Sequence, residues 1–131
     1  MEERTEAIEF IVKGSLVPKP RMTQRDKWAK RPIVERWFVY KDLVAMSYRR
    51  AGGGMFVRPV GIEYDFFILS RKKMDLDNLV KGINDALNGL AWLDDNIKWV
   101  RSLNAMIHFV NPEEQELARI KITPLNSGSN K

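Results

Sequence analysis

Apolar residues alternate with polar ones in four stretches of the chain, which is the period of a half-buried β-strand. Ile8, Phe10 and Val12 predict an opening strand. Residues 60–69 repeat the pattern and predict a strand with one well-buried face. Residues 97–109 and 118–122 predict two further strands, with Asn111 and Pro112 between them.

Two other stretches have the spacing of amphipathic helices. Residues from Val39 to Arg50 predict a first helix, which Gly52–Gly54 ends. A second helix is predicted from Asp75 or Asp77 to about Gly89, with a core-facing set of Leu79, Val80, Ile83, Ala86, Leu87 and Leu90. The order strand, helix, strand, helix, strand, strand predicts an α+β fold, with two helices packed on a mixed, mostly antiparallel sheet.

The remaining segments lack either period. Residues 14–36 combine three prolines with many basic residues and are predicted to be irregular. Residues 124–131 (PLNSGSNK) are predicted to be a flexible tail. The length of 131 residues is close to that of one ordinary domain, so residues 1–131 are expected to fold as a single unit.

Composition excludes several classes of function. The chain has no cysteine, which excludes disulfides, thiolate metal sites and a cysteine nucleophile. No apolar run approaches the ~20 residues that a membrane-spanning helix needs. We therefore expect a cytoplasmic protein without a membrane partner.

The net charge of +5 is unevenly distributed along the chain. Residues 1–12 carry a net charge of −3, residues 13–58 one of +9, and residues 59–131 one of −1. A strongly basic half favours a polyanionic partner, although a solvated basic surface would explain the same pattern.

Candidate chemistry is concentrated in residues 71–95, RKKMDLDNLVKGINDALNGLAWLDD. Asp75 and Asp77 stand at the predicted helix start, and Lys81 and Asp85 follow Asp77 at successive helical turns. Asp94 and Asp95 lie beyond the helix, and the sequence does not show how they would reach its first turn. Grouped carboxylates without cysteine suit Mg²⁺ or Mn²⁺, which can activate water for phosphodiester cleavage. Taken singly, each residue is also explained by a helix cap, an i,i+4 ion pair or a turn.

Other proteins with an Asp-x-Asp pattern fit poorly. Haloacid-type phosphatases place it directly at a strand end, whereas Arg71–Met74 intervene here, and their doubly wound fold needs a longer chain. Nucleotide-sugar transferases carry it on much larger domains.

The runs Asp75–Lys81 (DLDNLVK), Asn84–Leu87 (NDAL) and Trp92–Asp95 (WLDD) together resemble the RusA family of Holliday junction resolvases. The likeness spans about twenty-five contiguous residues with the spacing preserved, and the basic Pro-containing segment before it agrees more loosely.

The resemblance implies a Mg²⁺-dependent endodeoxyribonuclease, with Mn²⁺ as an alternative ion, that acts as a homodimer on four-way DNA and has no small-molecule substrate. It implies catalytic roles for Asp75, Asp77, Asp95 and Lys81, with Asp94 as a further metal ligand. Paired symmetric nicks require paired sites, which a two-fold dimer supplies. The residues expected to bind DNA are basic and lie on both sides of the first helix: Lys19, Arg21, Arg25, Lys27, Lys30, Arg31, Arg71, Lys72 and Lys73.

Two alternatives stay open at the level of sequence. One is a non-catalytic protein that binds DNA junctions, although unused carboxylates beside a phosphate path would only repel DNA. The other is the same nuclease chemistry on flaps or replication forks.

Overall fold

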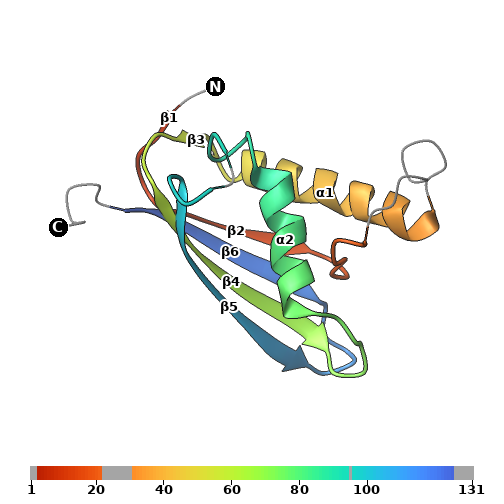
Figure 1. Ribbon diagram of the computed structural model, residues 1–131. Coiled ribbons are helices and arrows are strands. Elements are labelled where there is room, and N and C mark those ends of the chain that lie inside the picture. Colours follow the sequence, from red (N-terminus) through yellow and green to blue (C-terminus); the bar gives the residue numbers. More distant parts are fainter. Residues whose placement is uncertain (1–2, 22–30, 95, 126–131) are drawn as a thin grey trace.

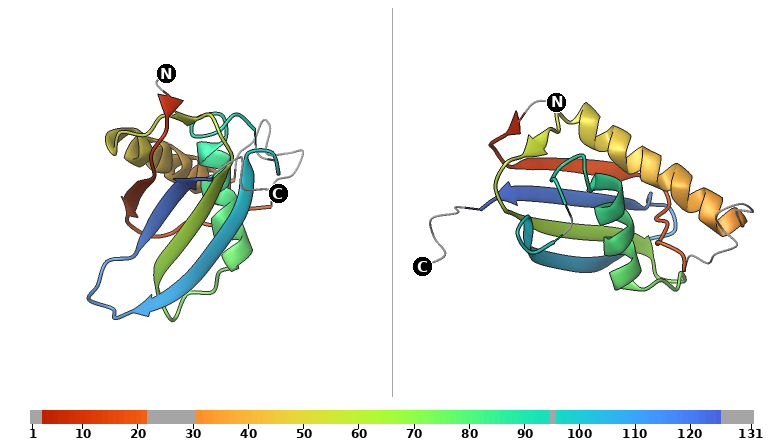
Figure 2. Two further views of the ribbon diagram at one scale, coloured as in Figure 1. Left: turned by 90° about the vertical axis from the view of Figure 1, so that its left-hand side faces the viewer. Right: turned by 45° about the horizontal axis from the view of Figure 1, so that its top comes forward.

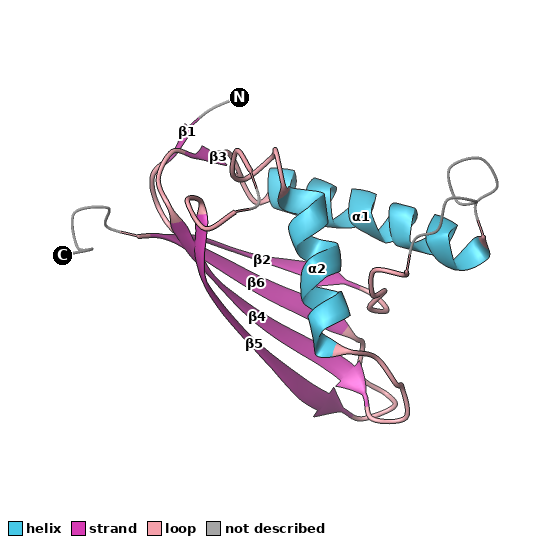
Figure 3. Ribbon diagram, in the orientation of Figure 1, coloured by secondary structure: helices cyan, strands magenta, loops and turns pink. Residues whose placement is uncertain are grey.

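The computed structural model describes residues 3–21, 31–94 and 96–125. Its elements are β1 (Glu3–Arg4), β2 (Ile8–Lys13), α1 (Pro32–Arg50), β3 (Met55–Phe56), β4 (Val60–Leu69), α2 (Leu76–Leu87), β5 (Val100–Val110) and β6 (Leu117–Pro124) (Figures 1 and 3). Four strands form the main sheet in the order β2-β6-β4-β5, in which only β4 and β5 are parallel. The predicted α+β fold with two helices on a mixed, mostly antiparallel sheet is confirmed.

Both helices lie on one face of the sheet (Figure 2), and the buried residues of β2, β4 and β6 are on that face. Alternate residues of β2, β4 and β6 point into this layer and form the core with Tyr48, Leu79, Leu87 and Trp92. The period-two pattern of these strands is therefore a direct consequence of the one-sided burial. The opposite face carries polar residues, including His108, whose Nε2 lies 2.7 Å from Asp65 Oδ1.

Helix α1 begins seven residues earlier than the sequence predicts, at Pro32 instead of Val39. Proline suits the first helical turn because the backbone N–H groups of that turn have no acceptor within the helix, so the N–H that proline lacks is not needed there. Its buried stripe is Val34, Trp37, Tyr40, Val44 and Tyr48, whereas Leu43 and Met46 are exposed. The predicted irregular segment 14–36 is thus wrong for its last five residues, and residues 22–30 lie outside the described chain.

Strand β5 differs from the prediction at its start. Residues 96–99 form a turn closed by the Trp99 N–H to the Asn96 carbonyl oxygen at 2.9 Å, and the strand begins at Val100. Ile97 is consequently exposed instead of lying in the sheet. β5 is one of the two edge strands, and its Leu103 and Phe109 are also exposed although they share the helix-facing parity.

The predicted flexible tail begins too early. Pro124 is the last residue of β6, and the Leu125 N–H donates to the Pro59 carbonyl oxygen at 2.7 Å. Residues 126–131 lie outside the described chain. No helix among the described residues is both long enough and apolar enough to cross a bilayer.

The connection β4–α2–β5 decides where the candidate residues lie. Parallel neighbours need a crossover, and α2 supplies it. The carboxyl ends of β4 and β5 and the first turn of α2 therefore meet at one edge of the molecule (Figure 1).

Candidate active site at the first turn of helix α2

Asp75 and Asp77 lie at the amino-terminal end of α2, as the sequence predicts. Asp75 is the N-cap residue, but its side chain makes no capping hydrogen bond. Within the described chain the Asp75 carboxylate has neither a hydrogen bond nor an ion pair, and both carboxylates are exposed. The positive end of the helix dipole stabilises negative charge at this position. Two exposed carboxylates thus lie at the amino-terminal end of α2.

Lys81 pairs with Asp77 one helical turn away, with Nζ 3.1 Å from the Asp77 carboxylate. Both side chains are largely exposed, at 59% and 74%. The pair is weak because solvent screens it, so Lys81 stays available to an incoming phosphate.

Asp85 does not join this pair. Its carboxylate lies 2.5 Å from Lys19 Nζ, and the Lys19 N–H donates to the Asn78 carbonyl oxygen at 3.1 Å. Lys19 Nζ also lies 5.7 Å from the centre of the Trp37 ring. Lys19 is thereby fixed beside α2 and is partly engaged in the fold.

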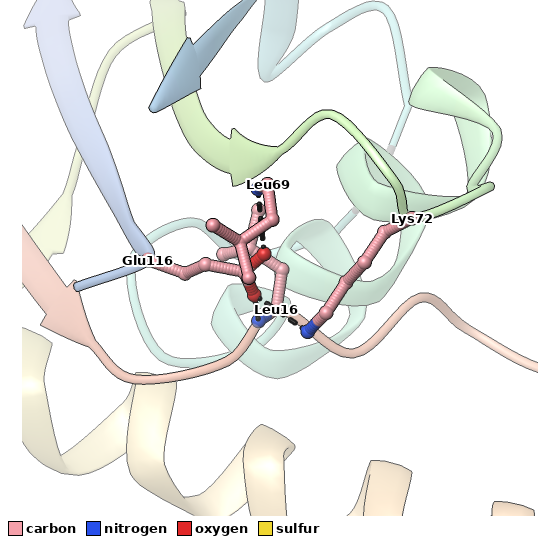
Figure 4. Close-up of polar contacts among 4 residues, drawn as sticks. All are labelled: Leu16, Leu69, Lys72 and Glu116. Carbon is pink, nitrogen blue, oxygen red and sulfur yellow. Dashed lines mark hydrogen bonds and ion pairs between the residues drawn. The ribbon is translucent and has the colours of Figure 1, made fainter. Parts of the chain in front are cut away.

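Glu116 is a site residue that the sequence reasoning missed. Its carboxylate accepts the Leu69 N–H at 2.8 Å and the Leu16 N–H at 3.3 Å, and pairs with Lys72 Nζ at 2.8 Å (Figure 4). These three groups belong to the end of β4, the segment after β2 and the loop that leads to Asp75. One buried carboxylate therefore ties together the segments that flank the candidate site.

The charge of Glu116 is stabilised where it lies. Burial raises the pKa of this carboxyl group, but the Leu69 N–H, the Lys72 ammonium and the Leu16 N–H together lower it below its ordinary value. The sequence does carry a signal for this role, because Glu116 has the same parity as the buried Ala118 and Ile120 of β6.

Asp94 lies at the other end of α2 from Asp75 and Asp77. The helix has 12 residues, which at the usual rise makes it about 18 Å long. Asp94 follows the turn after the helix, where Asn96 Nδ2 donates to its carboxylate at 3.1 Å. Asp95 lies outside the described residues. In the part of the chain that is described, no three acidic or histidine side chains gather into a metal-binding group.

The residues expected to bind DNA fall into three groups. Arg21, Arg31, Arg71 and Lys73 are exposed, and Arg31 Nη2 donates to the Arg21 carbonyl oxygen at 2.7 Å. Lys19 and Lys72 are partly buried in the ion pairs above. Arg25, Lys27 and Lys30 lie outside the described residues.

Replacing Arg71 and Lys73 with Ala should weaken DNA binding in a salt-dependent way, because both cations lie on the loop beside Asp75. Each phosphate contact contributes about −0.9 to the slope of log affinity against log salt, so the slope should flatten by up to about 1.8. The matched control is the double variant Arg49→Ala/Arg50→Ala, in the last turn of α1, which should leave the slope unchanged. An equal effect of both pairs on the slope would place the DNA elsewhere.

Comparison with known proteins identifies the family of the chain. The family model described as Endodeoxyribonuclease RusA matches residues 14–123, a range that includes both helices and strands β4, β5 and nearly all of β6. No curated protein matches the chain. The match covers most of the sequence, including every carboxylate discussed above. The chain therefore belongs to the RusA family of endodeoxyribonucleases, which are divalent-metal-dependent Holliday junction resolvases.

Proposed function

We propose that this protein is a Mg²⁺-dependent endonuclease that resolves four-way DNA junctions by paired symmetric nicks. The observation that carries the proposal is the pair of exposed carboxylates, Asp75 and Asp77, on the first turn of α2 with Lys81 beside them. This arrangement occurs in a chain of the RusA family, next to exposed basic residues of the loop that precedes the helix.

The donor set fits a hard divalent cation. Asp75 and Asp77 offer carboxylate oxygens, which Mg²⁺ and Mn²⁺ prefer, and neither carboxylate is committed to a helix cap. A bound ion of this kind supplies positive charge at the phosphate and a water of lowered pKa for the hydrolysis. Asp75 and Asp77 would hold it, and Asp95 or Asp94 would complete the ligand set.

Lys81→Ala should lower the cleavage rate more than the affinity for DNA. The ammonium group lies where charge develops on the phosphate, so it contributes more to the transition state than to the bound ground state. We expect kcat to fall on the order of 10²-fold, with junction affinity changed only slightly. Lys121→Ala, an exposed lysine of β6, is the control. Normal cleavage at saturating DNA would make Lys81 a docking residue only.

The positions of the carboxylates and the symmetry of the reaction both support the proposal of a homodimer. One chain holds Asp75 and Asp77 at one end of α2 and Asp94 at the other. In a two-fold dimer, the carboxyl-terminal end of α2 of one subunit can lie beside the amino-terminal end of α2 of the other subunit. We therefore propose that each active site takes carboxylates from both subunits.

Mixing two inactive variants tests this arrangement. Asp77→Asn and the double variant Asp94→Asn/Asp95→Asn should each be inactive alone. After denaturation and joint refolding, a mixed dimer with shared sites keeps one complete site, so nicking of one strand should return. No recovery from a verified mixed dimer would mean that each subunit builds its own site.

A cleavage assay on a four-way junction, a flap and a linear duplex of the same sequence tests the substrate. The proposal predicts fastest cleavage of the junction, with nicks at symmetric positions on opposed strands. Faster cleavage of the flap would favour the same chemistry on another branched DNA. Tight junction binding without cleavage in Mg²⁺ or Mn²⁺ would favour the non-catalytic alternative.

A further inference from the structure

A cavity of about 560 Å³ lies directly beside Asp75, between the carboxyl ends of β4 and β5 and the first turn of α2. Its apolar wall consists of Pro18, Ile68, Met74, Ile107 and Phe109. The volume is within the range of pockets that hold small organic groups, roughly 300–1,000 Å³. Neither the carboxylates nor Lys81 explain this apolar surface.

Phe109 is the most unusual part of the wall. This residue is 68% exposed, and it is the only aromatic one among the exposed large hydrophobic residues of the described chain. Ile68, which pairs with Phe109 across the two parallel strands, is buried and only 3% exposed. An aromatic ring exposed over an apolar floor is typical of a surface that a ligand covers.

Polar groups border the same cavity. The Asn78 side-chain amide makes no hydrogen bond within the described chain, although the Asn78 carbonyl oxygen accepts the Lys19 N–H. A side-chain amide offers a donor and an acceptor together, which is the pattern of nucleobase edges. Lys73 adds an exposed cation at the rim. The cavity thus combines a stacking surface, an amide and a positive charge.

We propose that this cavity receives a nucleobase adjacent to the cleaved phosphodiester bond, unstacked from the DNA and placed against Phe109. The proposal rests on the nuclease function and deepens it. Because the cavity borders Asp75, a base inside it belongs to a nucleotide next to the bond being cut. Bases at a branch point are the least costly to unstack, so this pocket would also favour junctions over continuous duplex.

Variants at Phe109 separate stacking from simple packing. Stacking of one base on an aromatic side chain is strong enough that Phe109→Ala should lower kcat/KM on a junction by about 5- to 150-fold. Phe109→Trp keeps the stacking surface and should retain most of the activity. Leu103→Ala removes an exposed apolar side chain from the same face of β5 and should change little. If Phe109→Ala cleaves normally, or if Phe109→Trp is as impaired as Phe109→Ala, the proposal is overturned.

Fluorescence of 2-aminopurine reports the unstacked base directly. Three junctions carry it at the 5′ nucleotide of the cleaved bond, at the 3′ nucleotide, or six nucleotides away along an arm. When the junctions are bound to the Asp77→Asn protein in Ca²⁺, the fluorescence should increase for one of the two junctions labelled beside the cleaved bond. It should not increase for the junction labelled six nucleotides away. The double variant Asp77→Asn/Phe109→Ala should show no increase with any of the three junctions.

The outcomes keep this proposal apart from the proposed function. Cleavage of junctions by the wild type without any fluorescence gain removes the base pocket and leaves the nuclease intact. A wild type that cleaves no DNA removes both. If Phe109→Ala loses activity because it no longer dimerises, as sedimentation would show, Phe109 contacts a second copy of the chain and the base pocket is overturned.

Discussion

Asp77→Asn should abolish most DNA cleavage while leaving the fold intact. The substitution keeps the size of the side chain but removes the negative charge that a divalent cation needs, and the Asp77 side chain is 74% exposed. We expect the rate in Mg²⁺ to fall on the order of 10²- to 10³-fold. Measured kcat on a four-way junction, with circular dichroism to verify folding, checks the prediction.

Affinity should respond in the opposite direction. Without metal, Asp77→Asn should bind a junction as tightly as the wild type or more tightly, because a carboxylate that repels phosphate is gone. Asp42→Asn, an exposed aspartate on α1, serves as the control and should behave like the wild type in both assays. Wild-type turnover by Asp77→Asn would remove Asp77 from the active site.

Glu116→Gln should be the most destabilising of the conservative substitutions near the site. Gln cannot pair with the Lys72 charge, and its NH₂ group must face at least one of the backbone N–H donors that Glu116 now accepts. Because the carboxylate is buried, we expect a loss of about 2–4 kcal/mol of unfolding free energy at pH 7. Urea denaturation measures it, with the exposed Glu113→Gln as the control.

The pH dependence identifies the cause. The pKa of Glu116 is lowered in the folded protein. Its charged form therefore stabilises the fold at pH values above about 4.5, which is the ordinary pKa of this group. That contribution is lost as the pH falls through the lowered pKa. The difference between wild type and Glu116→Gln should therefore shrink below pH 4.5. A constant difference down to pH 3 would assign the loss to packing instead of charge.

The sequence was sufficient for the parts of the fold that depend on local periodicity. Helix α2 was predictable because its buried residues recur at helical spacing between a start signal at Asp75 and Gly89, whose φ of 81° ends the turn after the helix. Strands β4 and β6 were predictable because only one face of the sheet is covered.

Features that depend on position in the sheet were not predictable. The parity of β5 is as expected, yet Leu103 and Phe109 are exposed on this edge strand. The predicted start of α1 is too late because Pro32 belongs to the proline-containing segment 14–36 that is predicted to be irregular, although the first turn of a helix tolerates proline.

In the candidate site, too, the sequence predicts the local features but not those that depend on tertiary structure. The i,i+4 spacing of Asp77 and Lys81 within one helix predicts that they lie close together, and their ion pair at 3.1 Å agrees. Glu116 lies far from these residues in sequence. It reaches Leu69 and Lys72, which precede Asp75, only through the register of β4 and β6, which no local pattern specifies. The separation of Asp94 from Asp75 by the length of α2 is likewise a matter of tertiary structure.

Binding of Mn²⁺ measured by calorimetry on the same preparation that is assayed for junction cleavage tests the central claim most directly. The account predicts that the wild type binds the ion and cleaves, and that Asp75→Asn/Asp77→Asn does neither while it still binds the junction and remains folded. A double variant that binds Mn²⁺ as the wild type does, or that still cuts the junction, would contradict the assignment of the active site to the first turn of α2.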